Sequence, residues 1–141
     1  MNKLPRPDDR QLMFDLVTTG YAVEQRLEQA LSRIGLSVAK FGALTHLVEA
    51  GAPLSLSECA KKMTCVRSNI TQLVDRLEAD GLVRRARDPA DRRGIRAEVT
   101  ALGLERQKAG AREVAKVQAQ LMELLKGTDR DQLRRVLSAI R

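Results

Sequence analysis

Residues 88–103 read DPADRRGIRAEVTALG, and this segment predicts a charged β-hairpin that leads directly into a long helix. Pro89 and Gly94 are typical of turns, because proline fixes φ and glycine tolerates conformations that other residues avoid. Residues 95–99 alternate apolar with polar side chains, which is the period of a half-buried strand whose apolar side faces the core. Thr100 can then cap the following helix.

The hairpin carries a high density of positive charge. Residues 82–85 supply its first strand, and residues 84–96 contain six arginines against two aspartates, a net charge of +4. Because like charges on a protruding loop repel one another, this density favours an anionic partner. We therefore interpret the hairpin as the DNA-contacting wing of a winged helix-turn-helix protein.

Composition and net charge support this interpretation. The chain has 141 residues, of which 43% are hydrophobic and 30% are charged, as in a globular domain with one core. A net charge of +7 favours a polyanionic partner. With one tyrosine, two phenylalanines and no tryptophan, the chain offers few platforms for stacking single-stranded bases, which favours duplex DNA.

Several function classes are disfavoured by the sequence. No apolar run approaches the roughly 18–20 residues of a spanning helix, and the N-terminus has no signal-peptide core, so we expect a cytoplasmic protein that makes no use of a membrane. Two cysteines and one histidine form neither a disulfide framework nor a zinc-ligand spacing. No nucleophile–base pair or glycine-rich phosphate loop is present. We therefore expect no enzyme, no cofactor and no metal.

Helical periodicity predicts the rest of a mainly α (α+β) architecture. Apolar residues recur at spacings of mostly three, four or seven over residues 8–34, which predicts an amphipathic helix roughly 40 Å long. One small domain does not cover a helix of that length, so part of its apolar stripe is expected to contact a second subunit. Further helices are expected at 37–49, 101–126 and about 133–140. The expected organisation is a single domain over residues 1–141, with a winged lobe at 37–100 and dimerisation helices at 8–34 and 101–141.

Residues 57–77 match the internal spacing of a helix-turn-helix. Ser57 offers an N-cap, and Ala60 is the small residue at the point where two helices would cross. Each position that this geometry requires to be apolar is apolar, namely Cys59, Met63, Cys65, Ile70 and Leu73. The second helix of such a unit lies in the major groove of DNA.

The exposed side of this second helix has side chains suited to reading DNA. Arginine can bond guanine through two donors, and asparagine or glutamine can do the same for adenine. The residues expected to face DNA from this recognition helix are Arg67, Ser68, Asn69, Thr71, Gln72 and Arg76, and Lys61 and Lys62 are expected to bind phosphates. A solvated polar face is the alternative interpretation, but the basic hairpin a few residues downstream favours DNA contact.

These motifs resemble those of the MarR family of bacterial transcriptional regulators. The resemblance is carried by residues 67–78 (RSNITQLVDRLE), by Gly81-Leu82-Val83, by residues 88–93 (DPADRR) and by Val99-Thr100-Ala101-Leu102-Gly103. It implies a homodimer, joined through the first helix and the last two, that binds a near-palindromic operator. It also implies that Arg93 enters the minor groove while Asp91 orients its side chain through an ion pair. The wing residues expected to contact DNA are Arg87, Asp91, Arg92, Arg93 and Arg96.

The resemblance also implies regulation by a small molecule. Members of this family often bind small aromatic anions between the dimer helices and the winged lobe. The candidate wall residues here are Tyr21, Arg26, His46 and Arg112, although a plain surface position is favoured for His46. The function expected on these grounds is a sequence-specific DNA-binding repressor that a small effector releases.

Two alternatives remain open from the sequence. A DNA-architectural protein would bind duplexes with little sequence preference, and the base-reading side chains Arg67, Asn69 and Gln72 argue against it. A redox-responsive regulator would act through Cys65, which lies in the expected turn. Because Cys59 and Cys65 both occupy expected core positions, inert packing is favoured for them.

Overall fold

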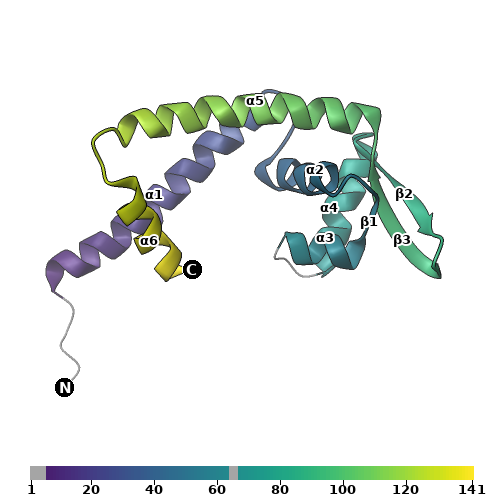
Figure 1. Cartoon of the computed structure of the whole chain (residues 1–141), viewed down its shortest axis with the longest axis horizontal. Helices are drawn as coiled ribbons and strands as arrows, with labels where there is room; N and C mark the ends of the chain where they lie inside the picture. The colour runs from purple at the N-terminus through teal and green to yellow at the C-terminus, as the bar shows by residue number, and fades with distance from the viewer. Residues whose placement is uncertain (1–5, 64–66) are drawn as a thin grey trace, which may run out of the picture.

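The helices and strands follow the expected order (Figure 1). The computed structural model describes residues 6–63 and 67–141, with the backbone alone at Pro7, Arg67 and Ser68. The elements are α1 (Pro7–Ser32), α2 (Val38–Ala50), β1 (Leu54–Ser55), α3 (Leu56–Lys62), α4 (Arg67–Ala79), β2 (Val83–Asp88), β3 (Asp91–Val99), α5 (Ala101–Leu124) and α6 (Arg130–Ile140). The helices predicted from periodicity are confirmed to within a few residues at each end.

A three-stranded antiparallel sheet of order β1-β3-β2 forms the base of the wing. Arg85 of β2 lies opposite Ala97 of β3, and Leu54 of β1 pairs with Ala97 from the other side. Ala97 is completely buried, as predicted, whereas Ile95 is 44% exposed. The prediction that Ile95 faces the core is wrong, because the outer half of the hairpin extends beyond the helices of the lobe (Figure 1).

Short-range capping bonds decide where the lobe helices begin. Ser55 accepts the Glu58 N–H at 3.1 Å, and the Glu58 carboxylate accepts the Ser55 N–H at 2.8 Å, which makes a reciprocal capping box. Helix α3 therefore begins directly after Ser55, and the prediction of Ser57 as its cap is wrong. Thr100 accepts the Gly103 N–H at 3.0 Å and begins α5, as predicted.

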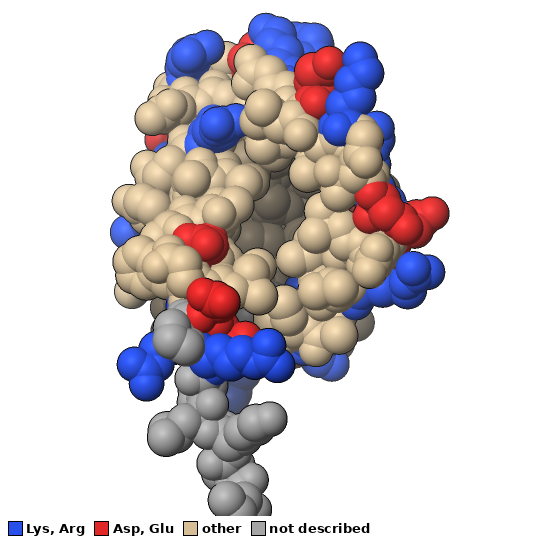
Figure 2. All heavy atoms as spheres, turned by 90° about the vertical axis from the view of Figure 1, so that its left-hand side faces the viewer, with Lys and Arg blue, Asp and Glu red and all other residues tan. Residues whose placement is uncertain are grey.

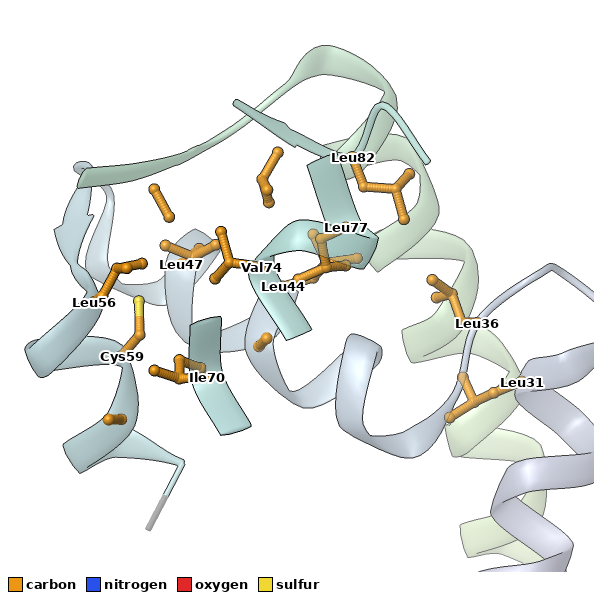
Figure 3. Close-up of a cluster of buried hydrophobic side chains, with 14 residues drawn as sticks. Leu31, Leu36, Leu44, Leu47, Leu56, Cys59, Ile70, Val74, Leu77 and Leu82 are labelled. Carbon is orange, nitrogen blue, oxygen red and sulfur yellow. The ribbon is translucent and has the colours of Figure 1, made fainter. Parts of the chain in front are cut away.

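The core of the winged lobe lies between α2, α3, α4 and the sheet (Figure 3). Leu44 of α2 and Ile70 and Leu77 of α4 are completely buried there. The apolar positions of the helix-turn-helix pattern lie as predicted. Buried or packed against this core are Cys59, Ala60, Met63, Ile70 and Leu73, whereas Cys65 lies outside the described residues.

The lobe is attached to the long helices through close contacts on α5. A Cβ atom at Gly110 would lie 2.6 Å from Phe41 Cδ2, so only glycine lets α2 approach α5 this closely. Arg106 Nη1 donates to the Ile34 carbonyl at 2.7 Å, which ties α5 to the turn between α1 and α2.

The long helices leave many apolar side chains uncovered. Helices α1 and α5 meet near the end of α1 and diverge towards its N-terminus (Figure 1). Figure 2 shows the end of the molecule away from the lobe, where uncharged side chains surround a hollow. Exposed apolar side chains of these helices include Leu12, Met13, Phe14, Leu16, Val17, Tyr21, Leu124, Val136, Leu137 and Ile140. Among the described residues, no helix is both long and apolar enough to cross a bilayer.

Candidate nucleic-acid interface

Helix α4, the predicted recognition helix, is held in the lobe by the buried side chains of one of its faces. Ile70, Val74 and Leu77 follow one another at spacings of four and three residues, and all three are buried. Because these side chains anchor the helix in the core, the opposite side of α4 is held towards solvent.

The exposed side of α4 carries most of the predicted DNA-reading residues that the structure describes. Asn69, Gln72 and Arg76 are exposed, and Thr71 is half-buried. The three exposed side chains also line a hollow of about 330 Å³ between α4 and the start of α2. Arg67 and Ser68 lie in the first turn of α4, but their side chains are outside the described part of the chain. Lys61 and Lys62 are exposed in the last turn of α3.

Three arginines near the tip of the wing have exposed side chains. Arg87, Arg92 and Arg93 are exposed, and none of them forms an ion pair with another residue in the described ranges 6–63 and 67–141. They line one side of the hairpin together, around a hollow of about 380 Å³. An unpaired guanidinium keeps all of its donors available for phosphates or base edges.

The two aspartates of the wing hold its turn rather than the side chain of Arg93. Asp88 accepts the Ala90 N–H at 2.9 Å, and Asp91 accepts the backbone N–H of Arg93 at 2.9 Å. A Cβ at Gly94 would lie 2.9 Å from Asp88 Cβ, so this turn requires glycine. The expected ion pair between Asp91 and the Arg93 guanidinium is absent from the described contacts. Asp91 orders the backbone at the tip, and the Arg93 side chain remains free.

Arg96 differs from the other wing arginines that were predicted to contact DNA. It is half-buried, its Nη1 donates to the Pro53 carbonyl at 3.3 Å, and its Nε lies 3.1 Å from Asp88 Oδ2. The pKa of Asp88 is lowered, first by the Ala90 N–H and then by Arg96. Arg96 thus joins β3 to the segment before β1, and its charge is paired with that of Asp88 within the lobe.

Arg84 and Arg85 are also paired within the protein. Arg84 Nε donates to Glu98 Oε2 at 2.8 Å across the hairpin, and this contact raises the pKa of Arg84 and lowers that of Glu98. Arg85 reaches Asp75 and Glu78 of α4. Sequence reasoning did not find the Arg85 contacts. Their only sequence signal is the i, i+3 spacing of two carboxylates shortly before the basic strand.

The winged lobe of this chain is similar to that of known proteins. Residues 36–95 match the family model of the MarR family. The transcriptional repressor IacR of Pseudomonas putida is 36% identical over 81 residues, which cover 57% of this chain and 48% of IacR. Over this segment the chain resembles the MarR family. It spans about half the length of the curated relatives it matches.

Solved MarR-family structures share the fold over nearly the whole chain. The regulator Sco3205 of Streptomyces coelicolor, solved in complex with DNA, is 24% identical with a TM-score of 0.86 and covers 98% of this chain and 89% of its own. CouR of Rhodococcus jostii RHA1, solved bound to p-coumaroyl-CoA, is 29% identical with a TM-score of 0.76 and covers 92% of this chain and 90% of its own. The likeness therefore extends to the long helices outside the winged lobe.

The four candidate effector residues are not gathered in one hollow. Arg26 lines a hollow of about 160 Å³ between α1 and α5 and a more apolar one of about 430 Å³ next to it. Neither hollow is lined by Tyr21, His46 or Arg112. Tyr21 is exposed on α1, His46 Nδ1 lies 3.9 Å from a Glu49 carboxylate oxygen on α2, and Arg112 is exposed on α5.

The smaller of these hollows is rich in positive charge. Arg26, Arg33 and Lys116 line it together with a single carboxylate, Glu113. Lys116 Nζ lies 2.8 Å from Glu113 Oε1 and is the main cause of the lowered pKa of Glu113, with Arg33 and Arg112 acting in the same direction. A second anionic group would therefore meet a favourable potential there.

Proposed function

We propose that this chain is a homodimeric, sequence-specific DNA-binding repressor that a small effector releases from its operator. The observation that carries the proposal is the joint exposure of polar residues on α4 and of three unpaired arginines on the wing. The start of α4 and the tip of the wing lie at the same edge of the lobe, away from α5 (Figure 1). Both elements can therefore approach one duplex.

In this proposal the two elements read different grooves. Helix α4 enters the major groove, where Asn69 and Gln72 bond adenine edges and Arg76 binds a phosphate. The wing follows the neighbouring minor groove, whose negative potential attracts Arg93 at the tip. Sco3205, solved in complex with DNA, supports this arrangement through the shared fold.

The proposed dimer follows from the uncovered helices. Apolar side chains along α1 and α6 are exposed in one chain, and a second copy would bury them against its own α1 and α6. Two lobes held by this frame would read two half-sites about one helical turn apart. The spacing of the lobes then controls whether both half-sites can be bound together.

The proposed effector acts on that spacing. An anion in the hollow beside Arg26 would bridge α1 and α5, the two helices that set the position of the lobe. A ligand that prefers one lobe spacing shifts the equilibrium towards it, and DNA binding changes by the same coupling free energy. CouR, solved with p-coumaroyl-CoA, supports a ligand-responsive member of the same fold.

The proposal is tested by selecting duplexes from a random pool with the purified protein. We expect the selected duplex to bind at least about a thousandfold more tightly than a scrambled duplex at the same salt concentration. Arg93→Ala should then weaken binding by about 1–3 kcal/mol without changing thermal unfolding, because the guanidinium has no partner among the described residues. Fluorescence anisotropy of the labelled duplex measures the affinities of the wild type and of the variant.

Arg10→Ala is the matched control, because it removes an exposed arginine from α1, far from the wing. It should leave the affinity unchanged. Equal binding of selected and scrambled duplexes would instead support an architectural protein. An unchanged affinity of Arg93→Ala would remove the wing tip from the mechanism.

A further inference from the structure

We infer that Arg85 is a positioning residue, which locks the wing to the recognition helix and does not itself contact DNA. It lies in the most basic segment of the chain, where a phosphate contact would be the ordinary expectation. Its guanidinium instead donates to two carboxylates of α4. The inference rests on the proposed DNA-binding function and says how the two reading elements keep their relative position.

The Arg85 guanidinium is divided between two carboxylates of α4. Its Nη1 donates to Glu78 Oε1 at 3.0 Å, and its Nη2 donates to Asp75 Oδ1. Asp75 and Glu78 are three residues apart and therefore lie on the same side of the helix. A planar guanidinium matches two such acceptors, and this fixes the direction of the side chain as well as its distance from the helix.

A third bond involves the backbone of the wing. The Arg85 N–H donates to Glu78 Oε2 at 3.0 Å. Strand β2 is an edge strand of the sheet, so alternate N–H groups along it have no neighbouring strand to bond. Glu78 satisfies one of these groups from α4, and both of its carboxylate oxygens are used by Arg85. The helix thus covers the open edge of the sheet at this point.

Arg85 and its neighbour Arg84 differ in the exposure of their side chains and in the charges nearby. The Arg85 side chain is 26% exposed, whereas that of Arg84 is 68% exposed. The bond to Asp75 is the main reason why the pKa of Arg85 is raised. A phosphate that approached Arg85 would also meet Asp75 and Glu78. The two negative charges of these carboxylates exceed the single positive charge of Arg85. The local potential therefore disfavours a direct DNA contact.

This bridge has a consequence for recognition. Because α4 and the wing read different grooves, binding requires both to hold the correct relative position at once. If the wing moved freely, its ordering on DNA would cost conformational entropy and weaken binding. A fixed bridge removes that cost before the protein meets DNA.

The first experiment uses the full chain without DNA. Amide hydrogen exchange by NMR should show the Arg85 N–H exchanging at least about tenfold faster in Glu78→Ala than in the wild type, because the bond to a charged acceptor is lost. Arg84→Gln is the matched control, and it should leave the Arg85 N–H within about twofold of the wild type. An unchanged Arg85 rate in Glu78→Ala would show that the bridge does not form.

The second experiment measures affinity for the selected duplex at several salt concentrations. Arg85→Gln should bind about tenfold more weakly at every concentration, with the wild-type salt slope, because no phosphate contact is lost. Arg87→Gln removes an unpaired arginine and should make the slope shallower by about 0.9. A shallower slope for Arg85→Gln, or wild-type affinity, would overturn the inference.

The decisive variant is Glu78→Gln, because the bridge and simple electrostatics predict opposite signs. Removing a negative charge beside DNA would tighten binding if charge alone mattered. The bridge instead predicts binding several-fold weaker, and no further loss when Glu78→Gln is added to Arg85→Gln, because both remove the same contact. Tighter binding by Glu78→Gln would overturn the inference. If the wild type selects no duplex, the proposed function fails, while the exchange experiment still decides whether the bridge exists.

Discussion

The winged lobe and the frame of long helices bury their apolar side chains to very different extents. In the lobe, Leu44, Ile70 and Leu77 are completely buried within one chain. In the frame, Phe14 of α1 and Ile140 of α6 remain 63% and 61% exposed. The lobe therefore completes its core alone, whereas the frame has an apolar surface that one chain leaves open. The open apolar surface of the frame is the surface that the proposed dimer would cover.

Two glycines of the long helices show the same difference in packing between the lobe and the frame. Gly103 of α5 sits against the lobe, where an added Cβ would lie 2.0 Å from the Leu82 carbonyl oxygen and 2.8 Å from Val99 Cγ2. At Gly20 of α1, no atom from outside the adjacent helix backbone lies within 4 Å of the corresponding position among the described residues. Packing therefore requires a glycine at position 103, and no contact in the described part of the chain requires one at position 20.

The largest expected effect tests this contrast directly. Gly103→Ala should destabilise the protein by about 4 kcal/mol or more, because a backbone carbonyl cannot move aside without breaking the contact between α5 and the sheet. Urea unfolding followed by circular dichroism measures the change in the free energy of unfolding.

Gly20→Ala is the matched control for that substitution. It should be neutral or stabilise the chain by about 0.5–1 kcal/mol, because alanine favours a helix interior and finds open space there. Similar losses in the two variants would mean that the lobe and the frame are equally closely packed, which would contradict the comparison.

The next effect concerns the frame. Phe14→Ser should weaken dimerisation by about 2 kcal/mol, or roughly thirtyfold in the dissociation constant, because a second copy no longer buries an aromatic ring. The free energy of unfolding of the separated chain should change little, since the ring is 63% exposed there. Analytical ultracentrifugation over a range of concentrations measures the dissociation constant.

Gln11→Ser is the control at a neighbouring polar position of α1, where no apolar side chain is removed and the described contact that is lost is the bond from Gln11 Nε2 to Asp15 Oδ1. It should leave the dimer intact. A Phe14→Ser variant that stays dimeric at the lowest measurable concentration would show that this part of α1 lies outside the interface.

Local signals in the sequence predict most of the lobe. Thr100 marks the start of α5, and the apolar spacing around Ala60 gives the helix-turn-helix core. The misplaced cap of α3 shows why a single residue type is a weak signal. Ser55 and Ser57 could both cap a helix, but only Ser55 has Glu58 three residues later, so the reciprocal bonds form there.

The sequence predicts the positive charge of the wing, but it does not predict which arginines are exposed and which bond other parts of the protein. Arg87 and Arg93 project from the hairpin, whereas Arg85 meets α4 and Arg96 meets the carbonyl of Pro53. These last contacts join residues that are separated along the chain by up to 43 positions. They depend on strand register and on the packing of α4 against β2, which charge counting does not contain.

The smallest expected effect compares the wing and the frame by their response to acid. The Ala90 N–H and the Arg96 guanidinium both lower the pKa of Asp88 in the folded protein. Because the folded pKa lies below the unfolded value of about 3.9, the stabilisation is complete above that pH and is lost as the pH falls through the folded value. The urea midpoint of the wild type should therefore fall more steeply below about pH 4 than that of Asp88→Asn.

Asp8→Asn provides the corresponding change in the frame, at a carboxylate that forms no ion pair within the described residues. At pH 7 its urea midpoint should lie close to that of the wild type, because no described ion pair is lost. Above about pH 5 the curve for Asp88→Asn should lie below the wild type, because an amide oxygen accepts the Ala90 N–H but carries no charge to face Arg96. If the curves for Asp88→Asn and the wild type are parallel down to pH 3, the Asp88 contacts do not contribute to folding, and the base of the wing is held by the Arg96–Pro53 bond and strand pairing alone.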